Sequence, residues 1–195
     1  MAYITRDSLM TLEAYAKARN DFRSQVMAHK KNRIVHLGEH ITLIFEDELT
    51  MRYQVQEMLR AEKMFEEEGI QDELSAYNPM IPDGNNWKAT MMIEYTDLDE
   101  RRRMLEDLIG VEDKVWVRAG DIDKVYAIAD EDLERENAQK TSAVHFLRFE
   151  LSHEAIASLK QGGKLTMGVD HPAYSVSLDS IPSKIQTSLL QDLAG

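Results

Sequence analysis

The sequence predicts an α+β fold with mostly antiparallel sheets packed with helices, and two observations lead to this prediction. Residues 34–45 and 87–95 alternate apolar and polar side chains, which is typical of half-buried strands, whereas residues 50–65 repeat apolar side chains with helical spacing. The strand-like runs also come in pairs interrupted by helices, which favours antiparallel pairing. An N-terminal helix and a C-terminal helix complete the expected architecture.

Two helices are expected in the first third of the chain. Thr5 is a suitable N-cap for the first helix, whose apolar residues share one face from Leu9 to Val26. The second helix covers residues 50–68 and ends before Gly69, because glycine commonly follows the last turn of a helix. Its apolar stripe contains Met51, Val55, Met58, Leu59 and Phe65.

A β-hairpin is expected between these helices. Gly38 and Glu39 lie between two β-rich runs, and a Gly-X pair in that position is typical of a two-residue type II′ turn. In this register His36 pairs with Ile41, and His36 and His40 point to opposite faces because strand side chains alternate. His36 is then expected to share its face with the apolar residues Ile34, Ile41, Leu43 and Phe45.

The remaining elements divide the chain into two parts that we expect to pack as one globular unit. The N-terminal α+β part covers residues 1–129 and contains the helix 50–68. A polar, acid-rich segment at 130–139 is the expected linker. The C-terminal part covers residues 140–195 and has the order β-α-β-β-α, with elements near 143–151, 152–162, 165–169, 174–178 and 182–193.

Composition and charge exclude several classes of protein. The 195 residues include no cysteine, which excludes disulfides, thiolate metal sites and a cysteine nucleophile. No apolar run approaches the roughly 20 residues that span a bilayer. The N-terminus lacks the pattern of a signal peptide, so a cytoplasmic protein without a membrane partner is expected. The net charge of -12 disfavours nucleic acid as a partner.

The charge is unevenly distributed along the chain. Residues 1–33 hold seven Lys or Arg against three Asp or Glu, a net charge of +4, which leaves -16 for the other 162 residues. A basic segment on an acidic body suggests either a homodimer or an acidic protein partner. The simpler alternative is a solvated helix face on which charges of both signs are mixed.

Glu62 is the most conspicuous candidate for a functional group, because it projects from the middle of the apolar helical stripe. Burying a carboxylate is costly unless it is paired, hydrogen-bonded or bound to a metal. His36 and His145 are likewise single polar residues on otherwise apolar strand faces. Two His and one carboxylate are the ligands of many non-haem iron sites, so these three residues could bind iron or another divalent metal. The alternative is a set of buried hydrogen bonds.

Further polar residues lie on the same helix and on the one that follows it. Gln54, Glu57, Tyr77 and Asn78 are expected to line a pocket for a cofactor or another ligand. The motifs of nucleotide-binding loops, of serine hydrolases and of zinc proteases are absent from the sequence. The residues themselves therefore name no reaction.

Four segments carry a resemblance to a known family. They are residues 43–62, in which the run YQVQEMLRAE at 53–62 is the most specific, and residues 77–82, 89–94 and 171–174. With these motifs the chain resembles the uncharacterised bacterial domain-of-unknown-function family 3501 over essentially its whole length. The family has no known activity. Its members often occur beside rubrerythrin-like proteins and iron–sulfur or flavin oxidoreductases, so the resemblance implies a redox or peroxide-stress setting.

Two functions are favoured at this point, ahead of a third, nucleic-acid binding by the basic segment 1–33. The first is a non-catalytic accessory protein that contacts a redox or rubrerythrin-like protein partner, a setting that the resemblance implies. The second is a His/carboxylate metal-binding protein or a non-haem iron enzyme. The metal content of the purified protein separates the two, because a metal site assembled by folding retains its ion.

If the basic segment 1–33 mediates self-association, light scattering will show a dimer at low ionic strength that dissociates as added salt screens the charges. A monomer at low salt, with the first helix fully packed on its own chain, would contradict this prediction.

Overall fold

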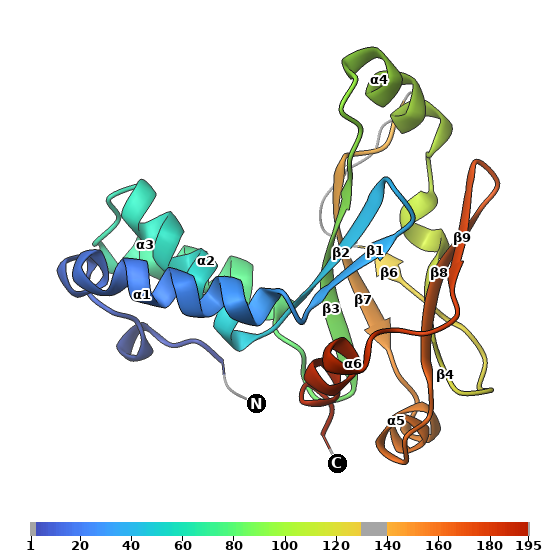
Figure 1. Ribbon diagram of the computed structural model, residues 1–195. Helices are drawn as coiled ribbons and strands as arrows, with labels where there is room; N and C mark the ends of the chain where they lie inside the picture. Colours follow the sequence, from blue (N-terminus) through green and yellow to red (C-terminus); the bar gives the residue numbers. More distant parts are fainter. Residues whose placement is uncertain (1–2, 130–139, 195) are drawn as a thin grey trace.

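Two antiparallel sheets face each other, and an arm of helices projects from the end of one of them (Figure 1). The structure, a computed structural model, describes residues 3–129 and 140–194, and the expected linker 130–139 lies outside the described residues. The arm is formed by the blue and teal helices of Figure 1. The predicted α+β class with mostly antiparallel sheets is therefore confirmed.

The first sheet has the strand order β1-β2-β3-β7-β6, and each neighbouring pair is antiparallel. The strands are β1 (Ile34–Leu37), β2 (Ile41–Glu46), β3 (Asn86–Ile93), β7 (Val144–Glu150) and β6 (Ile128–Ala129). The alternation predicted for β3 is present, since Trp87, Ala89, Met91 and Ile93 are buried. One face of this sheet therefore belongs to the core.

The second sheet has the order β5-β4-β8-β9 and is also antiparallel. Its strands are β5 (Val125–Tyr126), β4 (Val115–Ala119), β8 (Leu165–His171) and β9 (Tyr174–Leu178). Val117 and Met167 from this sheet share one apolar cluster with Leu43 and Met91 from the first. Each sheet contains strands from both parts of the chain, because β7 lies between β3 and β6 in the first sheet and β8 pairs with β4 in the second.

The arm has its own apolar core. Its helices are α1 (Leu12–Lys30), α2 (Glu48–Ala61) and α3 (Glu67–Tyr77), with the short 3-10 turns η1 (Arg6–Ser8) and η2 (Asn78–Met80). The cluster that they enclose contains Ile4, Leu9, Met51, Val55, Leu59, Ile70 and Leu74. The other helical elements are α4 (Leu98–Asp107), η3 (Val111–Lys114), α5 (His153–Lys160) and α6 (Ser183–Leu190). Over the described ranges, no helix is long and apolar enough to cross a membrane.

Two side-chain amides attach the N-terminal segment to the arm. Gln56 Oε1 accepts a hydrogen bond from Met10 N at 2.7 Å, and Gln56 Nε2 donates to Met10 O at 3.4 Å. Asn78 makes the same pair of bonds with Ile4, at 2.9 Å and 3.0 Å. Each amide thus satisfies the backbone donor and acceptor of one residue, as a neighbouring strand would.

The first helix begins later than the sequence predicts. Thr11 is the N-cap of α1, and its side chain accepts a hydrogen bond from Ala14 N. Thr5 instead precedes η1, where its backbone N–H donates to Ser8 Oγ. Leu9 therefore enters the apolar cluster of the arm from an extended segment rather than from the helix.

The hairpin forms, but its register differs by one residue from the prediction. Leu37 pairs with Ile41 and His36 with Thr42, so the loop contains three residues, 38–40, and His36 lies on the face away from the core. The reason is a contact with β9. Tyr174 Oη donates to Leu37 O at 2.6 Å and accepts a hydrogen bond from His40 N at 3.1 Å, which holds the longer loop in place.

The helix predicted at 50–68 is present as α2, but its predicted end is wrong, because α2 ends at Ala61 and Gly69 lies within α3. Lys63 adopts a left-handed conformation with φ 50°. Its N–H bonds to Arg60 O, and Met64 N bonds to Leu59 O, which is the hydrogen-bond pattern of a Schellman motif. Glycine commonly provides the left-handed residue of this motif, so the lysine gave no sequence signal for the end of the helix.

Glu57 joins α2 to α1. Its carboxylate accepts hydrogen bonds from Arg19 Nε and Nη2, both at 2.8 Å, and from Tyr15 Oη at 2.8 Å. The bidentate bond from Arg19 holds the pKa of Glu57 down at about 2, although burial opposes this shift. Burial and the Glu57 carboxylate raise the pKa of the Tyr15 hydroxyl above its usual range. Part of the basic segment is thus already paired within its own chain.

The substitution Glu57→Gln should lower the free energy of unfolding at pH 7 by about 1–3 kcal/mol, because Arg19 and Tyr15 lose an ionised acceptor. The folded pKa of Glu57 lies below its unfolded value, so its contribution is present above pH 4.5 and is lost as the pH falls towards 2. Urea unfolding at pH 7 and pH 3 tests this, and the difference from the wild type should shrink at pH 3. Glu13→Gln, in an exposed pair with Lys17, should change stability by less than about 0.5 kcal/mol.

Candidate functional site

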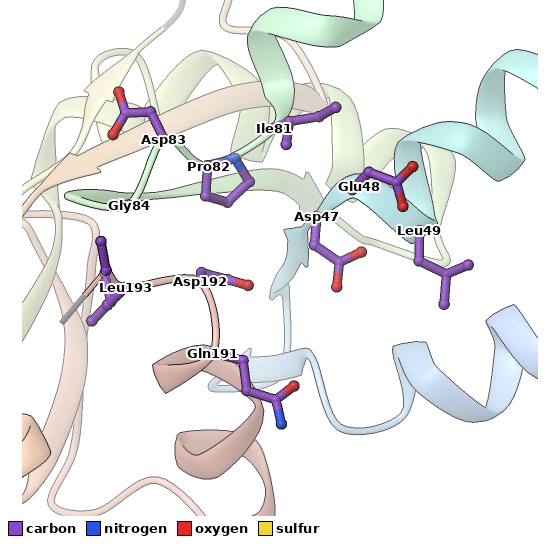
Figure 2. A pocket seen from close by; sticks show the side chains of 11 residues that line it. Asp47, Glu48, Leu49, Ile81, Pro82, Asp83, Gly84, Gln191, Asp192 and Leu193 are labelled. Carbon is purple, nitrogen blue, oxygen red and sulfur yellow. The ribbon is translucent and has the colours of Figure 1, made fainter. Parts of the chain in front are cut away.

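A cleft with a volume of about 570 Å³ lies where the arm meets the sheets (Figure 2). Its walls are the start of α2, the loop before β3 and the turn after α6. Four acidic residues belong to the lining, namely Asp47, Glu48, Asp83 and Asp192. The segments that carry them are far apart in the sequence, so only the folded chain forms the cleft.

Local hydrogen bonds position two of these acids. Asp47 follows β2 and caps α2, since its Oδ1 accepts a hydrogen bond from Thr50 N while its own N–H donates to Thr50 Oγ1. Asp83 Oδ1 accepts from Asn85 N in the turn before β3. Gly84 has φ 104° in that turn, and its carbonyl accepts a hydrogen bond from Ala194 N at 2.8 Å. The last described residues are therefore attached directly to the cleft.

Arg33 lies behind the cleft, and its side chain is only 1% exposed. All five of its N–H donors are used. Nε donates to Phe45 O at 2.9 Å, Nη2 donates to Glu46 O at 3.1 Å and to Asp192 Oδ2 at 2.5 Å, and Nη1 donates to the carbonyl and hydroxyl oxygens of Ser188, each at 3.3 Å. A single side chain thus joins the ends of α1, β2 and α6.

The polar groups around Arg33 form a continuous chain. His29 Nε2 lies 2.5 Å from Asp47 Oδ2, and the same oxygen lies 3.5 Å from Arg33 Nε. Asp192 is the second carboxylate that Arg33 contacts. Burial raises the pKa of Asp192 to about 6, although Arg33 acts in the opposite direction. The ionised Asp192 therefore depends on the Arg33 guanidinium.

The hydrogen bonds of Arg33 hold the arm to the sheets. The oxygens of Asp47, Asp83 and Asp192 accept hydrogen bonds from groups of the same chain, as the distances above show. Among residues 3–129 and 140–194, no group of three His, Cys, Asp or Glu could hold a metal ion. The chemical properties of the cleft are those of an acidic surface over a buried, fully bonded guanidinium.

The structure does not bring the three predicted metal ligands together. Glu62 is exposed at the end of α2, so its predicted burial is wrong, and the left-handed Lys63 explains why the helical stripe stops before it. His36 is exposed on the outer face of β1, where Nδ1 lies 3.1 Å from Thr42 Oγ1. His145 is buried on the opposite face of the same sheet, and its Nε2 lies 2.8 Å from Thr141 Oγ1.

The four residues predicted to line a pocket have different surroundings. Asn78 lines a second cavity of about 770 Å³, between the N-terminal segment and α3, where its amide is bonded to Ile4. Tyr77 packs against the apolar cluster of the arm. Glu57 bonds Arg19 and Tyr15, and Gln54 is half-buried on α2. A common pocket for all four residues stays a prediction.

Comparisons with known proteins agree with the motifs of the sequence. The family model described as "Protein of unknown function (DUF3501)" matches residues 3–193. The chain belongs to the DUF3501 family. No curated protein matches it significantly. A crystal structure described as a novel protein of unknown function from Burkholderia pseudomallei is similar over 99% of this chain and 100% of its own, with 54% identity and a TM-score of 0.94.

Sequence reasoning missed the central residue of this DUF3501 protein. Arg33 follows Lys30 and Lys31 and resembles any member of an exposed basic run. Asp192, its main partner, lies 159 positions away in a short polar turn. The only local signal is that Arg33 stands directly before the apolar strand β1, where a buried side chain is expected once the strand is recognised.

The substitution Arg33→Met should lower the free energy of unfolding at pH 7 by about 3–5 kcal/mol, because it leaves Asp192 buried without its cation. The folded pKa of Asp192 is above its unfolded value, and loss of Arg33 raises it further. A carboxyl of this kind stabilises the fold below its unfolded pKa and loses that contribution as the pH rises through the folded value. The variant should therefore recover part of its stability at pH 5.

Chemical unfolding at pH 7 and pH 5 provides the measurement, with Arg23→Met on the exposed side of α1 as the matched control. The control should stay within about 0.5 kcal/mol of the wild type at both pH values. An Arg33→Met variant that is equally destabilised at both pH values would show that Asp192 does not carry the effect.

Proposed function

We propose that this DUF3501 protein is a non-catalytic accessory protein of the cytoplasm that acts through protein contacts made by its helical arm. The observation that carries the proposal is Phe65, which is 73% exposed in the loop between α2 and α3. A large apolar side chain that is this exposed gains the most from burial against another surface. The loop lies at the part of the arm far from the sheets, where a partner has free access (Figure 1).

The conformation of the loop supports a contact role. The left-handed Lys63 reverses the chain, and Met64 packs against the apolar cluster of the arm. Phe65 is the next residue and remains outside. Exposed carboxylates stand on either side of it, at Glu62 and Glu66. The partner surface that fits this loop has an apolar pocket with a basic rim.

The hydrogen bonds within the arm also support the proposal. Glu57, Gln56 and Asn78 are bonded to Arg19, Met10 and Ile4 of their own chain. These side chains organise the arm as a rigid support for the loop around Phe65. Preorganised elements lose less conformational entropy on binding than flexible ones do.

The resemblance to family 3501 supports a redox or peroxide-stress setting, and a rubrerythrin-like protein is the partner that we propose. Calorimetric titration of the two purified proteins tests this pairing. Phe65→Glu should weaken binding by at least about tenfold, because it places a charge in an apolar pocket.

Leu98→Glu is the matched control, since Leu98 is also apolar, is 66% exposed and lies on α4 rather than on the arm. It should leave the affinity unchanged. Equal losses for both variants, or no binding of the wild type to a rubrerythrin-like protein, would contradict the proposed role of the arm.

The sequence also left open a metal protein that uses His36, Glu62 and His145, but the structure places these three residues apart, and elemental analysis tests the accessory role against it. After anaerobic purification with iron supplied, the accessory protein should contain far less than one iron per chain. One iron per chain that His36→Ala removes would favour the alternative.

A further inference from the structure

The outer face of the second sheet carries a compact cluster of charged and aromatic residues. Val115 and Val117 point into the core, so Trp116 between them points outwards. The register of the sheet places Trp116 opposite Tyr126 on one side and opposite Gly168 on the other. Asp170 lies two residues after Gly168 on β8 and therefore shares the same face.

An ammonium group occupies the centre of this cluster. Lys124 Nζ lies 4.1 Å from the centroid of the Trp116 ring and donates a hydrogen bond to Asp170 Oδ2 at 2.7 Å. Tyr126 Oη donates to the same carboxylate oxygen at 2.7 Å. An aromatic face and a carboxylate are the two groups that recognise organic ammonium ions in proteins. The bond from Lys124 also lowers the pKa of Asp170, which keeps the carboxylate ionised.

The indole is fixed before any ligand arrives. Trp116 is only 3% exposed although it lies on an outer face. A Cβ atom on Gly168 would lie 2.5 Å from Trp116 Cζ2, so the ring rests directly on the backbone of β8. Glycine at this position is what allows the close approach. The ring therefore presents its other face to Lys124.

Lys124 belongs to the loop between β4 and β5, and that loop has its own support. Arg118 Nε donates to Ile122 O at 2.8 Å, and Ile122 N donates to Ala119 O at 3.1 Å. The side chain of Lys124 is itself about one-third exposed, as is that of Asp170. The ammonium can therefore leave the indole without any change in the two sheets.

We propose that Trp116 and Asp170 form a binding site for a primary alkylammonium group, and that Lys124 occupies this site in the free protein. A primary ammonium satisfies both groups, because its charge faces the ring while an N–H donates to Asp170 Oδ2. Tyr126 holds the carboxylate in position. A quaternary ammonium has no N–H and satisfies only the ring, so the site should prefer primary amines.

Lys124 competes with any external amine because it is tethered beside the site. A tethered group acts at an effective concentration that reaches roughly the millimolar range or above. An external amine below this effective concentration therefore does not displace Lys124 from the site. Shortening the side chain at position 124 should remove this competition and expose the face of the indole.

The test uses nitrogen-15 NMR of the whole protein during titration with n-butylammonium at constant ionic strength. The indole N–H of Trp116 is the reporter. The other tryptophan, Trp87, is an internal reference because its Nε1 donates to Leu189 O at 2.9 Å in the interior. Lys124→Ala should bind n-butylammonium at least about tenfold more tightly than the wild type does, with a saturable shift of the Trp116 signal alone.

Two further variants and two further probes complete the experiment. Lys124→Met keeps an alkyl chain over the ring and should bind no more tightly than the wild type. Asp170→Asn in the Lys124→Ala background should lose the binding, and tetramethylammonium should bind the single variant more weakly than n-butylammonium. Nα-acetyl-lysine N-methylamide then distinguishes the source of the amine: binding indicates a lysine side chain of another protein, and exclusion indicates a free small amine.

Equal affinities of the Ala and Met variants, or a titration in which the Trp116 signal does not move, would overturn the proposal. Thermal unfolding establishes that each variant is folded. If Lys124→Ala fails to fold, Lys124→Ser opens the same space with a polar side chain, and the same comparison with Lys124→Met decides.

Discussion

Arg33 follows the last turn of α1, and its guanidinium lies between the end of β2 and the C-terminal helix α6. An isolated buried charge would destabilise the fold by many kcal/mol, so its position is tolerated only where every donor finds an acceptor. Those acceptors come from Phe45, Glu46, Ser188 and Asp192. This set of bonds joins the arm, the wall of the acidic cleft and α6, while Leu189 adds a second attachment of α6 through the Trp87 indole.

Much of the fold follows from local sequence patterns. The alternation in β3 and the glycine between β1 and β2 predicted elements that the structure contains, because these signals act over a few residues. The errors arise where a distant contact or an unusual backbone decides. Tyr174 sets the hairpin loop, and Lys63 ends α2 in a conformation that glycine usually provides. The sequence of the hairpin does not show its contact with Tyr174, and the sequence around Lys63 does not show the left-handed conformation.

The candidate site was less predictable than the fold. Glu62 stands out in the sequence because the helical pattern continues past Ala61, where α2 ends, but its side chain is exposed. The local sequence does not distinguish Arg33 or Asp192 as site residues, because a buried arginine in a basic run looks like an exposed one. The cluster around Trp116 likewise joins residues from β4, β5 and β8 through the register of the second sheet. Sequence patterns place side chains on faces, and only the tertiary structure shows which faces meet.

The bond between Arg33 and Asp192 has a consequence for the order in which the molecule assembles. The apolar cluster of the arm uses residues up to Ile81, so the arm can form while the ribosome is still synthesising the second half of the chain. The Arg33 guanidinium remains hydrated until Asp192, which lies 159 residues later in the chain, leaves the ribosome. Closing so long a loop is slow and entropically unfavourable, so it comes late in folding. A chain interrupted before Ser188 would therefore keep a folded arm whose direction relative to the sheets is undetermined.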